Sequence, residues 1–339
     1  MSVDLSTKYL GMTLRNPLAV SACSSLTGEL DKLRRLEDAG ASMAVLPSLF
    51  EEQIEHEEVE IARLYDFQTE SFAESLTHFP ELQAHSTGPT DYLDHLRAAK
   101  QAVSIPVIGS LNGSSEGGWI RYAKLIEEAG ADALELNIYF VPTNPLMTSL
   151  DVEQRYIDLV AAVRKSVSIP LAVKIGPNFT SLPHFAQRLI EAGANGLVLF
   201  NRYLEADIDL DQLQFKPDLV LSNRHEARVP IRWIAILRDV LPQTSFAATS
   251  GVHRMQGIVK LLLAGADVTM MASILLIKGP EFLATLLDDV RTWMEENEYD
   301  SVEQLKGSMS RRNCPDPSAL ERANYMQALT TYTSDHYQP

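Results

Sequence analysis

The chain has 339 residues, of which 45% are hydrophobic, so it is long enough to bury a large core as one domain or two. Its 29 Lys and Arg against 45 Asp and Glu give a formal charge of -16, which disfavours nucleic acids and anionic membranes as partners. Two cysteines exclude a disulfide framework, and there is neither a signal peptide nor an apolar run of membrane-spanning length, so we expect a cytoplasmic protein.

The first predicted element is a β-hairpin within residues 1–17. Gly11 stands between two short runs with β propensity, and glycine supplies the turn conformation that joins two strands. The first buried strand follows at residues 18–21. We therefore expect the hairpin to close the floor of the domain.

Joints between helices and strands then repeat along the chain. Four times, an Ala-Gly-Ala phrase follows a helical pattern of apolar residues and precedes a buried apolar run. The glycines of these phrases are Gly40, Gly130, Gly193 and Gly265. Glycine is favoured just past the end of a helix because it adopts the left-handed conformation at little cost. Each phrase therefore predicts the end of a helix and the start of a buried strand.

A second repeated phrase marks further strands. Val-Ser-Ile-Pro occurs at residues 103–106 and 167–170, and residues 241–246 form a looser copy. Proline ends the preceding helix and opens a short apolar strand. Together with residues 18–21, the two phrases predict strands near residues 18, 43, 105, 133, 169, 196, 245 and 267.

Eight continuous apolar strands that alternate with helices indicate a parallel sheet covered by helices. We expect an α/β fold in which residues 1–339 form a single (β/α)8 TIM barrel. The alternative is an open, doubly wound sheet, which would need a glycine-rich turn after its first strand. Ser21-Ala22-Cys23-Ser24-Ser25 is not such a turn, so the barrel is favoured.

The spacing of the strands predicts insertions after strands 2, 4 and 6. Residues 48–91 and 201–229 are the two long segments. Because they follow strands, they belong to the face of a barrel that carries active sites. Residues 281–339, after the last strand, are predicted to form a C-terminal helical tail.

Catalytic side chains on a barrel come from the carboxyl ends of its strands. Small residues, three amides and one lysine are predicted there, with no His, Asp or Glu group suited to a metal. They are Ala22, Cys23, Pro47, Ser48, Ser110, Asn112, Asn137, Lys174, Asn201, Ser250, Gly251, Ala272 and Ser273. The last four end strands 7 and 8 and leave backbone N–H groups accessible, which predicts a phosphate cradle.

Lys174 closes an apolar strand, where an unpaired charge would be costly, so we expect it to have a partner. Three roles are open at this point: a lysine that reaches solvent, a cation beside a ring that becomes anionic on reduction, and a Schiff-base lysine. Asn137 and Asn201 can each donate and accept hydrogen bonds, which suits a small planar heterocycle as substrate. Cys23 is expected to be packed rather than nucleophilic.

The chain resembles the soluble, class 1 dihydroorotate dehydrogenases nearly from end to end. The matching segments are residues 5–11 and 16–18, Glu135-Leu136-Asn137, Val173-Lys174, Asn201, Ser250-Gly251-Val252 and residues 299–307. The resemblance implies a barrel that holds FMN, usually as a homodimer, and oxidises dihydroorotate to orotate in pyrimidine biosynthesis.

The resemblance also implies roles for the predicted site residues. Ala22, Cys23 and Ser48 would contact the cofactor, and Asn137 and Lys174 would contact the isoalloxazine ring or the edge of the substrate. Asn201 would face the substrate. The FMN phosphate would be held by Ser250, Gly251, Ala272 and Ser273.

Several positions depart from the family pattern. Phe140 stands where the family carries the Cys or Ser that takes a proton from the substrate, and Pro47 stands where it usually has Lys. Ser250 replaces a glycine of the phosphate turn, and residues 223–228 replace a glycine-rich turn. Another residue must therefore accept the proton, and the candidates are Tyr139 and Thr143.

We expect an FMN-dependent oxidoreductase that passes a hydride from dihydroorotate or a similar dihydropyrimidine to FMN, with Lys174 as the catalytic cation. Two alternatives are an aldolase-type barrel with Lys174 as a Schiff-base lysine, and an FMN-binding relative without turnover. Two cysteines cannot hold an iron–sulfur cluster, so the sequence leaves the electron acceptor or partner subunit unknown.

Overall fold

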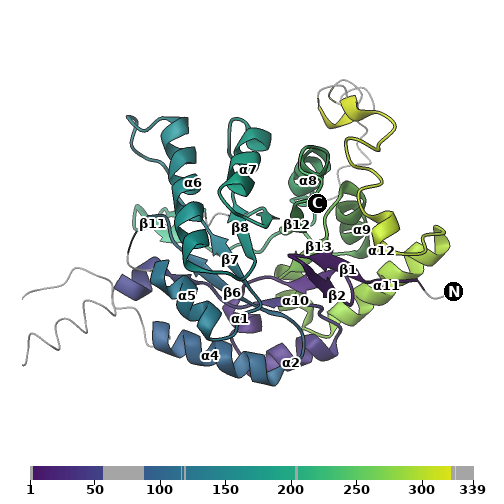
Figure 1. The fold of residues 1–339 in the computed structure, drawn as a ribbon, viewed down its shortest axis with the longest axis horizontal. Helices are drawn as coiled ribbons and strands as arrows, with labels where there is room; N and C mark the ends of the chain where they lie inside the picture. The colour runs from purple at the N-terminus through teal and green to yellow at the C-terminus, as the bar shows by residue number, and fades with distance from the viewer. Residues whose placement is uncertain are drawn as a thin grey trace, which may run out of the picture.

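Eight parallel strands close into a barrel in the computed structural model, which describes residues 3–55, 88–115, 117, 120–202, 205–321 and 325 (Figure 1). The barrel strands are β3 (Leu18–Val20), β4 (Ala44–Val45), β6 (Val107–Asn112), β7 (Ala133–Asn137), β8 (Leu171–Ile175), β9 (Gly196–Leu199), β12 (Ser245–Ala248) and β13 (Val268–Met271). Each pairs with the next in this order, β13 pairs with β3, and the ring is closed. The predicted barrel and its eight strands are confirmed.

Helices surround the barrel and join successive strands (Figure 1). The longer ones are α2 (Leu30–Asp38), α4 (Pro89–Ala102), α5 (Arg121–Glu128), α6 (Ser149–Ser166), α7 (Leu182–Glu191), α8 (Arg228–Val240), α9 (Met255–Ala264) and α11 (Phe282–Glu296). The shorter ones are α1 (Ser24–Thr27), α10 (Ser273–Lys278), α12 (Val302–Leu305) and the 3-10 helix η2 (Pro317–Leu320). No helix among the described residues combines the length and apolar character needed to cross a membrane.

The four glycines of the Ala-Gly-Ala phrases all have a positive φ. The angle is 106° at Gly40, 95° at Gly130, 111° at Gly193 and 122° at Gly265. Each lies between the end of a helix and the start of the next barrel strand. The predicted joints are therefore confirmed, and the left-handed conformation explains why glycine stands at each one.

Apolar residues fill both the space between strands and helices and the inside of the barrel. The inner core includes Tyr9, Leu10 and Leu14 from an N-terminal hairpin formed by β1 (Thr7–Tyr9) and β2 (Met12–Leu14). The hairpin is bonded to the amino-terminal ends of two strands, since Leu10 N donates to Ser245 Oγ at 2.9 Å and Thr7 Oγ1 donates to Asp267 O at 3.0 Å. It closes the floor of the barrel, as the sequence predicted.

The two Val-Ser-Ile-Pro phrases are held in the same way on this floor. Glu37, at the end of α2, accepts hydrogen bonds from Ser104 N at 2.9 Å and Ile105 N at 3.2 Å. Glu127, at the end of α5, accepts from Ser168 N at 2.9 Å and Ile169 N at 3.1 Å. A helix of one unit thus binds the segment that opens a later strand.

Asp267 joins the C-terminal segment to the floor. Its carboxylate accepts from Phe246 N at 2.7 Å and pairs with Arg238 at 2.8 Å and Lys306 at 2.9 Å. Beyond α12, Gly307 N donates to Leu262 O at 2.9 Å, in α9. The charge of this buried carboxylate is therefore matched by two cations.

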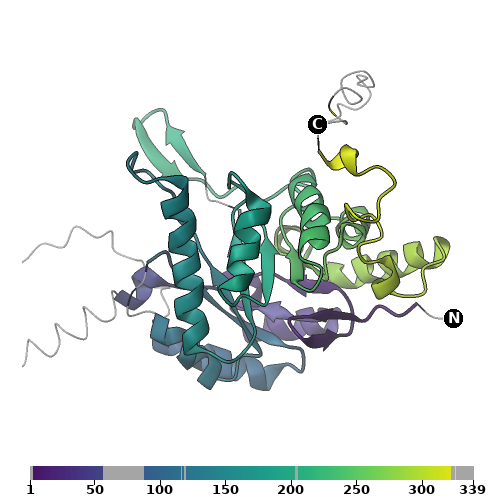
Figure 2. The ribbon, with the colours of Figure 1, turned by 45° about the horizontal axis from the view of Figure 1, so that its top comes forward.

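A second hairpin lies between β9 and α8, within the predicted insertion 201–229. Its strands are β10 (Ala206–Asp209) and β11 (Gln214–Pro217), which pair antiparallel. Figure 2 shows it projecting clear of the barrel. Of the predicted insertion 48–91, the structure describes β5 (Leu49–Phe50), which pairs with the end of β6, and the segments up to residue 55 and from residue 88; the rest lies outside the described residues.

Candidate functional site

A cavity of about 150 Å³ opens at the carboxyl ends of β12 and β13. Seven of the predicted site residues line it: Ala22, Lys174, Asn201, Ser250, Gly251, Ala272 and Ser273. They come from five different strand ends of the barrel. The barrel therefore brings together residues that are as far as 251 positions apart in the chain.

Lys174 is buried and has the partner that its position requires. Its Nζ lies 3.3 Å from Oε1 of Glu135, and the two side chains are 10% and 1% exposed. Ala133, Glu135 and Asn137 are two residues apart along β7 and so share one face of the strand; Ala133 belongs to the inner core, so the side chains of Glu135 and Asn137 also point into the barrel. The sequence contained this signal, since Glu135 is a charged residue within a buried strand, two positions before a predicted site residue.

Two amides meet beside this ion pair. Asn137 pairs with Lys174 in the register of β7 and β8, and Asn201 Nδ2 donates to Asn137 Oδ1 at 2.8 Å. Asn137 is buried, whereas Asn201 lies at the wall of the cavity. One bond uses one donor of Asn201 and one acceptor of Asn137, so each amide keeps further capacity for a bound ring.

The cradle at the end of β12 has an unusual backbone. Ser250 and Gly251 both have a φ of 74°, and the Ser250 hydroxyl donates to Phe200 O at 3.2 Å. A Cβ at Gly251 would lie 2.4 Å from Ala227 N, closer than real Cβ contacts allow. Glycine is thus required at 251 both by conformation and by close packing.

One further residue of this site, Ser222, could not be placed from the sequence, whereas His253 directly follows the predicted cradle. Ser222, in the insertion before α8, lines the cavity and donates from Oγ to Ser273 Oγ at 2.8 Å. The same hydroxyl lies 3.2 Å from His253 Nε2. Burial lowers the pKa of His253, and Glu226 opposes this shift. Ser222 N also donates to Ser273 Oγ at 3.2 Å, so Ser222 links the residues that follow β12 and β13.

The other cofactor candidates lie outside this cavity. Cys23 caps the start of α1, is partly buried and has a pKa raised by burial, which disfavours the reactive thiolate. Ser48 lines a separate cavity of about 570 Å³ together with His95, and its hydroxyl lies 2.8 Å from Ser110 Oγ. Contact of these two residues with a cofactor stays a prediction.

The segment after β7 carries no proton acceptor at residue 140. Phe140 is half-buried, and the Arg155 guanidinium lies 4.2 Å from the centre of its ring. Tyr139 is half-buried and Thr143 is exposed. Among the residues that the structure describes, no three His, Cys, Asp or Glu gather closely enough to hold a metal ion.

The residues of the cavity fit the phosphate end of a flavin mononucleotide. Glycine and alanine leave backbone N–H groups accessible, and serine hydroxyls add further hydrogen-bonding groups. A volume of about 150 Å³ is below the roughly 300–1,000 Å³ of pockets that enclose a whole ligand. The cavity therefore suits the phosphate-bearing part of such a cofactor.

Comparison with known proteins gives one family. Residues 4–294 match the family model described as dihydroorotate dehydrogenase. A protein of Aeropyrum pernix, provisionally named dihydroorotate dehydrogenase A (fumarate), is 29% identical over 218 residues, which cover 62% of this chain and 70% of the relative. The catalytic subunit of dihydroorotate dehydrogenase B (NAD(+)) from Listeria monocytogenes is 26% identical, over 89% of this chain and 97% of its own.

The corresponding subunit from Thermoplasma acidophilum is 23% identical, over 90% of this chain and 98% of its own. The family model spans most of the chain, including the strand ends that line the cavity. The chain therefore belongs to the dihydroorotate dehydrogenase family of oxidoreductases, which confirms the class 1 resemblance found in the sequence.

Proposed function

We propose that this protein is an FMN-dependent oxidoreductase that oxidises dihydroorotate or a similar dihydropyrimidine. The observation that carries the proposal is the cavity in which a buried lysine, an amide and a cradle of small residues converge at the carboxyl ends of the barrel strands. FMN, when bound, would supply the ring that accepts a hydride from the substrate. The family relationship and the small residues at Ser250, Gly251, Ala272 and Ser273 support FMN as the cofactor.

Lys174 would stabilise negative charge at this site. Glu135 holds the ammonium group in place and offsets the cost of burying it. A fixed cation in a buried site is most effective where charge develops during the reaction. An ammonium that is ion-paired is also a poor nucleophile, which disfavours the Schiff-base alternative for Lys174.

Asn137 and Asn201 would orient the substrate. Their mutual hydrogen bond fixes both amide planes, and their remaining donors and acceptors suit the mixed edge of a pyrimidine ring. Neither amide can take the proton that leaves the substrate together with the hydride. We propose that the hydroxyl of Tyr139 or Thr143, the two hydroxyl groups nearest in sequence to Phe140, relays this proton to solvent: its oxygen accepts the substrate proton while its own proton passes to water.

Absorbance tests the proposal directly. The purified protein, supplied with FMN, should show flavin bands that bleach when dihydroorotate is added without oxygen. Bands that do not bleach with dihydroorotate or other dihydropyrimidines would favour a flavin-binding relative without turnover, and a protein that takes up no FMN would reject the cofactor. The variants Tyr139→Phe and Thr143→Val should differ in bleaching rate, and the slower one identifies the proton acceptor.

We also propose that a second copy of the chain covers the β10–β11 hairpin. Large apolar side chains on and around this hairpin are more than half exposed: Ile208, Leu210, Leu213, Phe215, Leu219 and Val220. Exposed apolar patches of this kind mark interfaces. Light scattering of the wild type should give the mass of a dimer, and Leu213→Ser with Phe215→Ser should give a monomer; a wild-type monomer would contradict this.

A further inference from the structure

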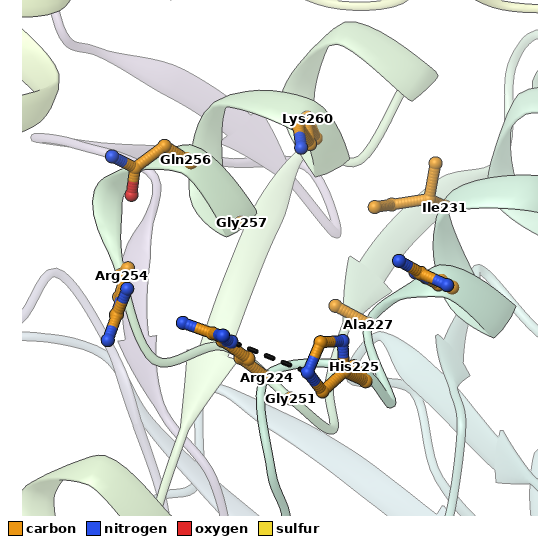
Figure 3. Close-up of a pocket in the computed structure, with 10 residues that line it drawn as sticks. Arg224, His225, Ala227, Ile231, Gly251, Arg254, Gln256, Gly257 and Lys260 are labelled. Carbon is orange, nitrogen blue, oxygen red and sulfur yellow. Dashed lines mark hydrogen bonds between the residues drawn. The ribbon is translucent and has the colours of Figure 1, made fainter. Parts of the chain in front are cut away.

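A further pocket, of about 310 Å³, lies between the starts of α8 and α9, next to the cofactor cavity (Figure 3). Four cationic side chains line it: Arg224 and Arg228 on the side of α8, and Arg254 and Lys260 on the side of α9. His225 and Gln256 complete its polar wall, and Ala227 and Ile231 form an apolar wall. In Figure 3, the labelled side chains from the starts of the two helices and from the segments that precede them lie around an open centre.

Carboxylates of the described residues do not neutralise the positive charges of this pocket. Among the described residues, none of the four cations forms an ion pair. The nearest acidic residue in sequence, Glu226, is engaged elsewhere, because it pairs with Arg202 at 2.9 Å and accepts from Asn223 N at 2.8 Å. In a chain with a formal charge of -16, four unpaired cations around one pocket form a local anion-attracting field.

The backbone at this pocket also contributes positive charge, as the side chains do. α8 and α9 both begin beside it, neither has a side-chain cap, and neither has an acidic residue in its first turn. The start of a helix carries a partial positive charge, which adds to that of the arginines. An acidic ligand would therefore be stabilised by both side chains and helix ends.

The number and kind of the cations indicate the class of ligand. Arginine binds phosphate through two parallel hydrogen bonds, and lysine binds it as a point charge. A pocket of this volume takes a small molecule, and its apolar wall can contact a ring. We propose that the pocket between α8 and α9 binds a small molecule with two or more phosphate groups, of the nucleoside diphosphate class.

Binding there is coupled to the cofactor cavity by the chain itself. Gly251 lines both spaces, and Ala227 N occupies the position next to it. The segment from Ser222 to Arg228 has its first residue in the cofactor cavity and its last in the pocket. An anion that draws Arg224 and Arg228 inward would shift this segment, so the anion and the ligand of the cofactor cavity should change each other's affinity by the same factor.

Calorimetric titration of the full chain with inorganic pyrophosphate, ADP and inorganic phosphate tests the proposal. Excess FMN is present so that the cofactor cradle is not available to the probes. Pyrophosphate and ADP should bind more tightly than phosphate, with an affinity that falls as salt is raised. If ADP binds more tightly than pyrophosphate, the apolar wall contacts the base of the nucleotide.

Variants locate the binding. Arg254→Gln with Lys260→Gln should weaken pyrophosphate about tenfold or more, because two charge-assisted contacts are lost. Arg97→Gln with Lys124→Gln is the matched control, since it also removes two exposed positive charges but lies on α4 and α5. The affinity of the control variant for pyrophosphate should stay within about twofold of that of the wild type. Arg224→Gln with Arg228→Gln repeats the test from the side of α8.

Two outcomes would overturn the proposal. One is the absence of pyrophosphate and ADP binding to the wild type at millimolar concentration. The other is an equal loss in the pocket variant and its control, which would show a general effect of charge. Neither outcome depends on flavin reduction, so failure of this site is distinguishable from failure of the proposed oxidoreductase function.

Discussion

The two ends of the barrel are built differently. At the floor, one device is used twice: Glu37 and Glu127 each bind the Ser and Ile of a repeated phrase. At the carboxyl ends, the main polar contacts are single ones, such as Lys174 with Glu135 and Asn201 with Asn137. Repeated bonds on one face and individual ones on the other indicate that stability and chemistry are assigned to opposite ends of the same strands.

A pair of lysine variants, one at each end of the barrel, should give the largest difference between the two ends. Lys174→Met removes the cation of the cofactor cavity, and flavin reduction by substrate should slow by about two to three orders of magnitude. Lys100→Met removes a lysine that pairs with Asp132 at 2.6 Å on the floor, and the rate should change less than about twofold. Anaerobic stopped-flow absorbance measures both. A similar rate loss in the two variants would contradict the division of roles.

A pair of glycine variants tests the same division through the backbone. Gly251→Ala places a Cβ 2.4 Å from Ala227 N at a φ of 74°, so FMN affinity should fall about tenfold or more. Gly11→Ala has a similar φ of 79° but meets no atom within 4 Å, so it should cost about 1–2 kcal/mol of stability and leave FMN affinity unchanged. Flavin fluorescence and thermal unfolding measure the two effects. Equal FMN affinity in both variants would refute the close-packing argument.

The smallest expected effect concerns the carboxylates that bind the repeated phrases at the floor of the barrel. Hydrogen bonds from Ser168 lower the pKa of Glu127 from 4.5. A carboxyl group whose pKa is lowered by folding stabilises the protein above its unfolded pKa, and this contribution is lost as the pH falls through the folded pKa. At pH 7, the free energy of unfolding of the wild type should therefore be up to about 1 kcal/mol larger than that of Glu127→Gln. This difference should disappear as the pH falls below 4.5.

Urea unfolding at several pH values measures this difference. Glu37→Gln should behave in the same way, because the same device holds the earlier phrase and the pKa of Glu37 is also lowered. Flavin content per folded molecule is the control and should not change. If the difference in stability between wild type and variant increased toward low pH, the stabilising role of the ionised carboxylates would be contradicted.

The barrel could be predicted because its signals are local and repeated. Gly40 and its three counterparts each mark a joint within a few residues, and the count of strands follows from them. The rule that strand ends carry chemistry then predicts that Lys174, Asn201, Ser250 and Ser273 lie at one site, and all four line the same cavity.

What could not be predicted depends on contacts between distant segments. Ser222 reaches Ser273 and His253 from an irregular insertion, and no sequence periodicity positions such a segment. Ser48 lines a different cavity from Ser250, next to β5, which continues alongside β6 beyond β4. The pairing of Lys174 was expected, but the choice of Glu135 depends on the register of β7 against β8.

The bond between Lys306 and Asp267 bears on how this protein can be shortened for experiments. The family match ends at residue 294, yet Lys306, Gly307 and Met309 bind the barrel and α9 beyond that point. A stop codon placed after α11 would leave the Asp267 carboxylate with one cation where it now has two, beneath the inner core. Domain dissection should therefore retain the chain at least to Met309.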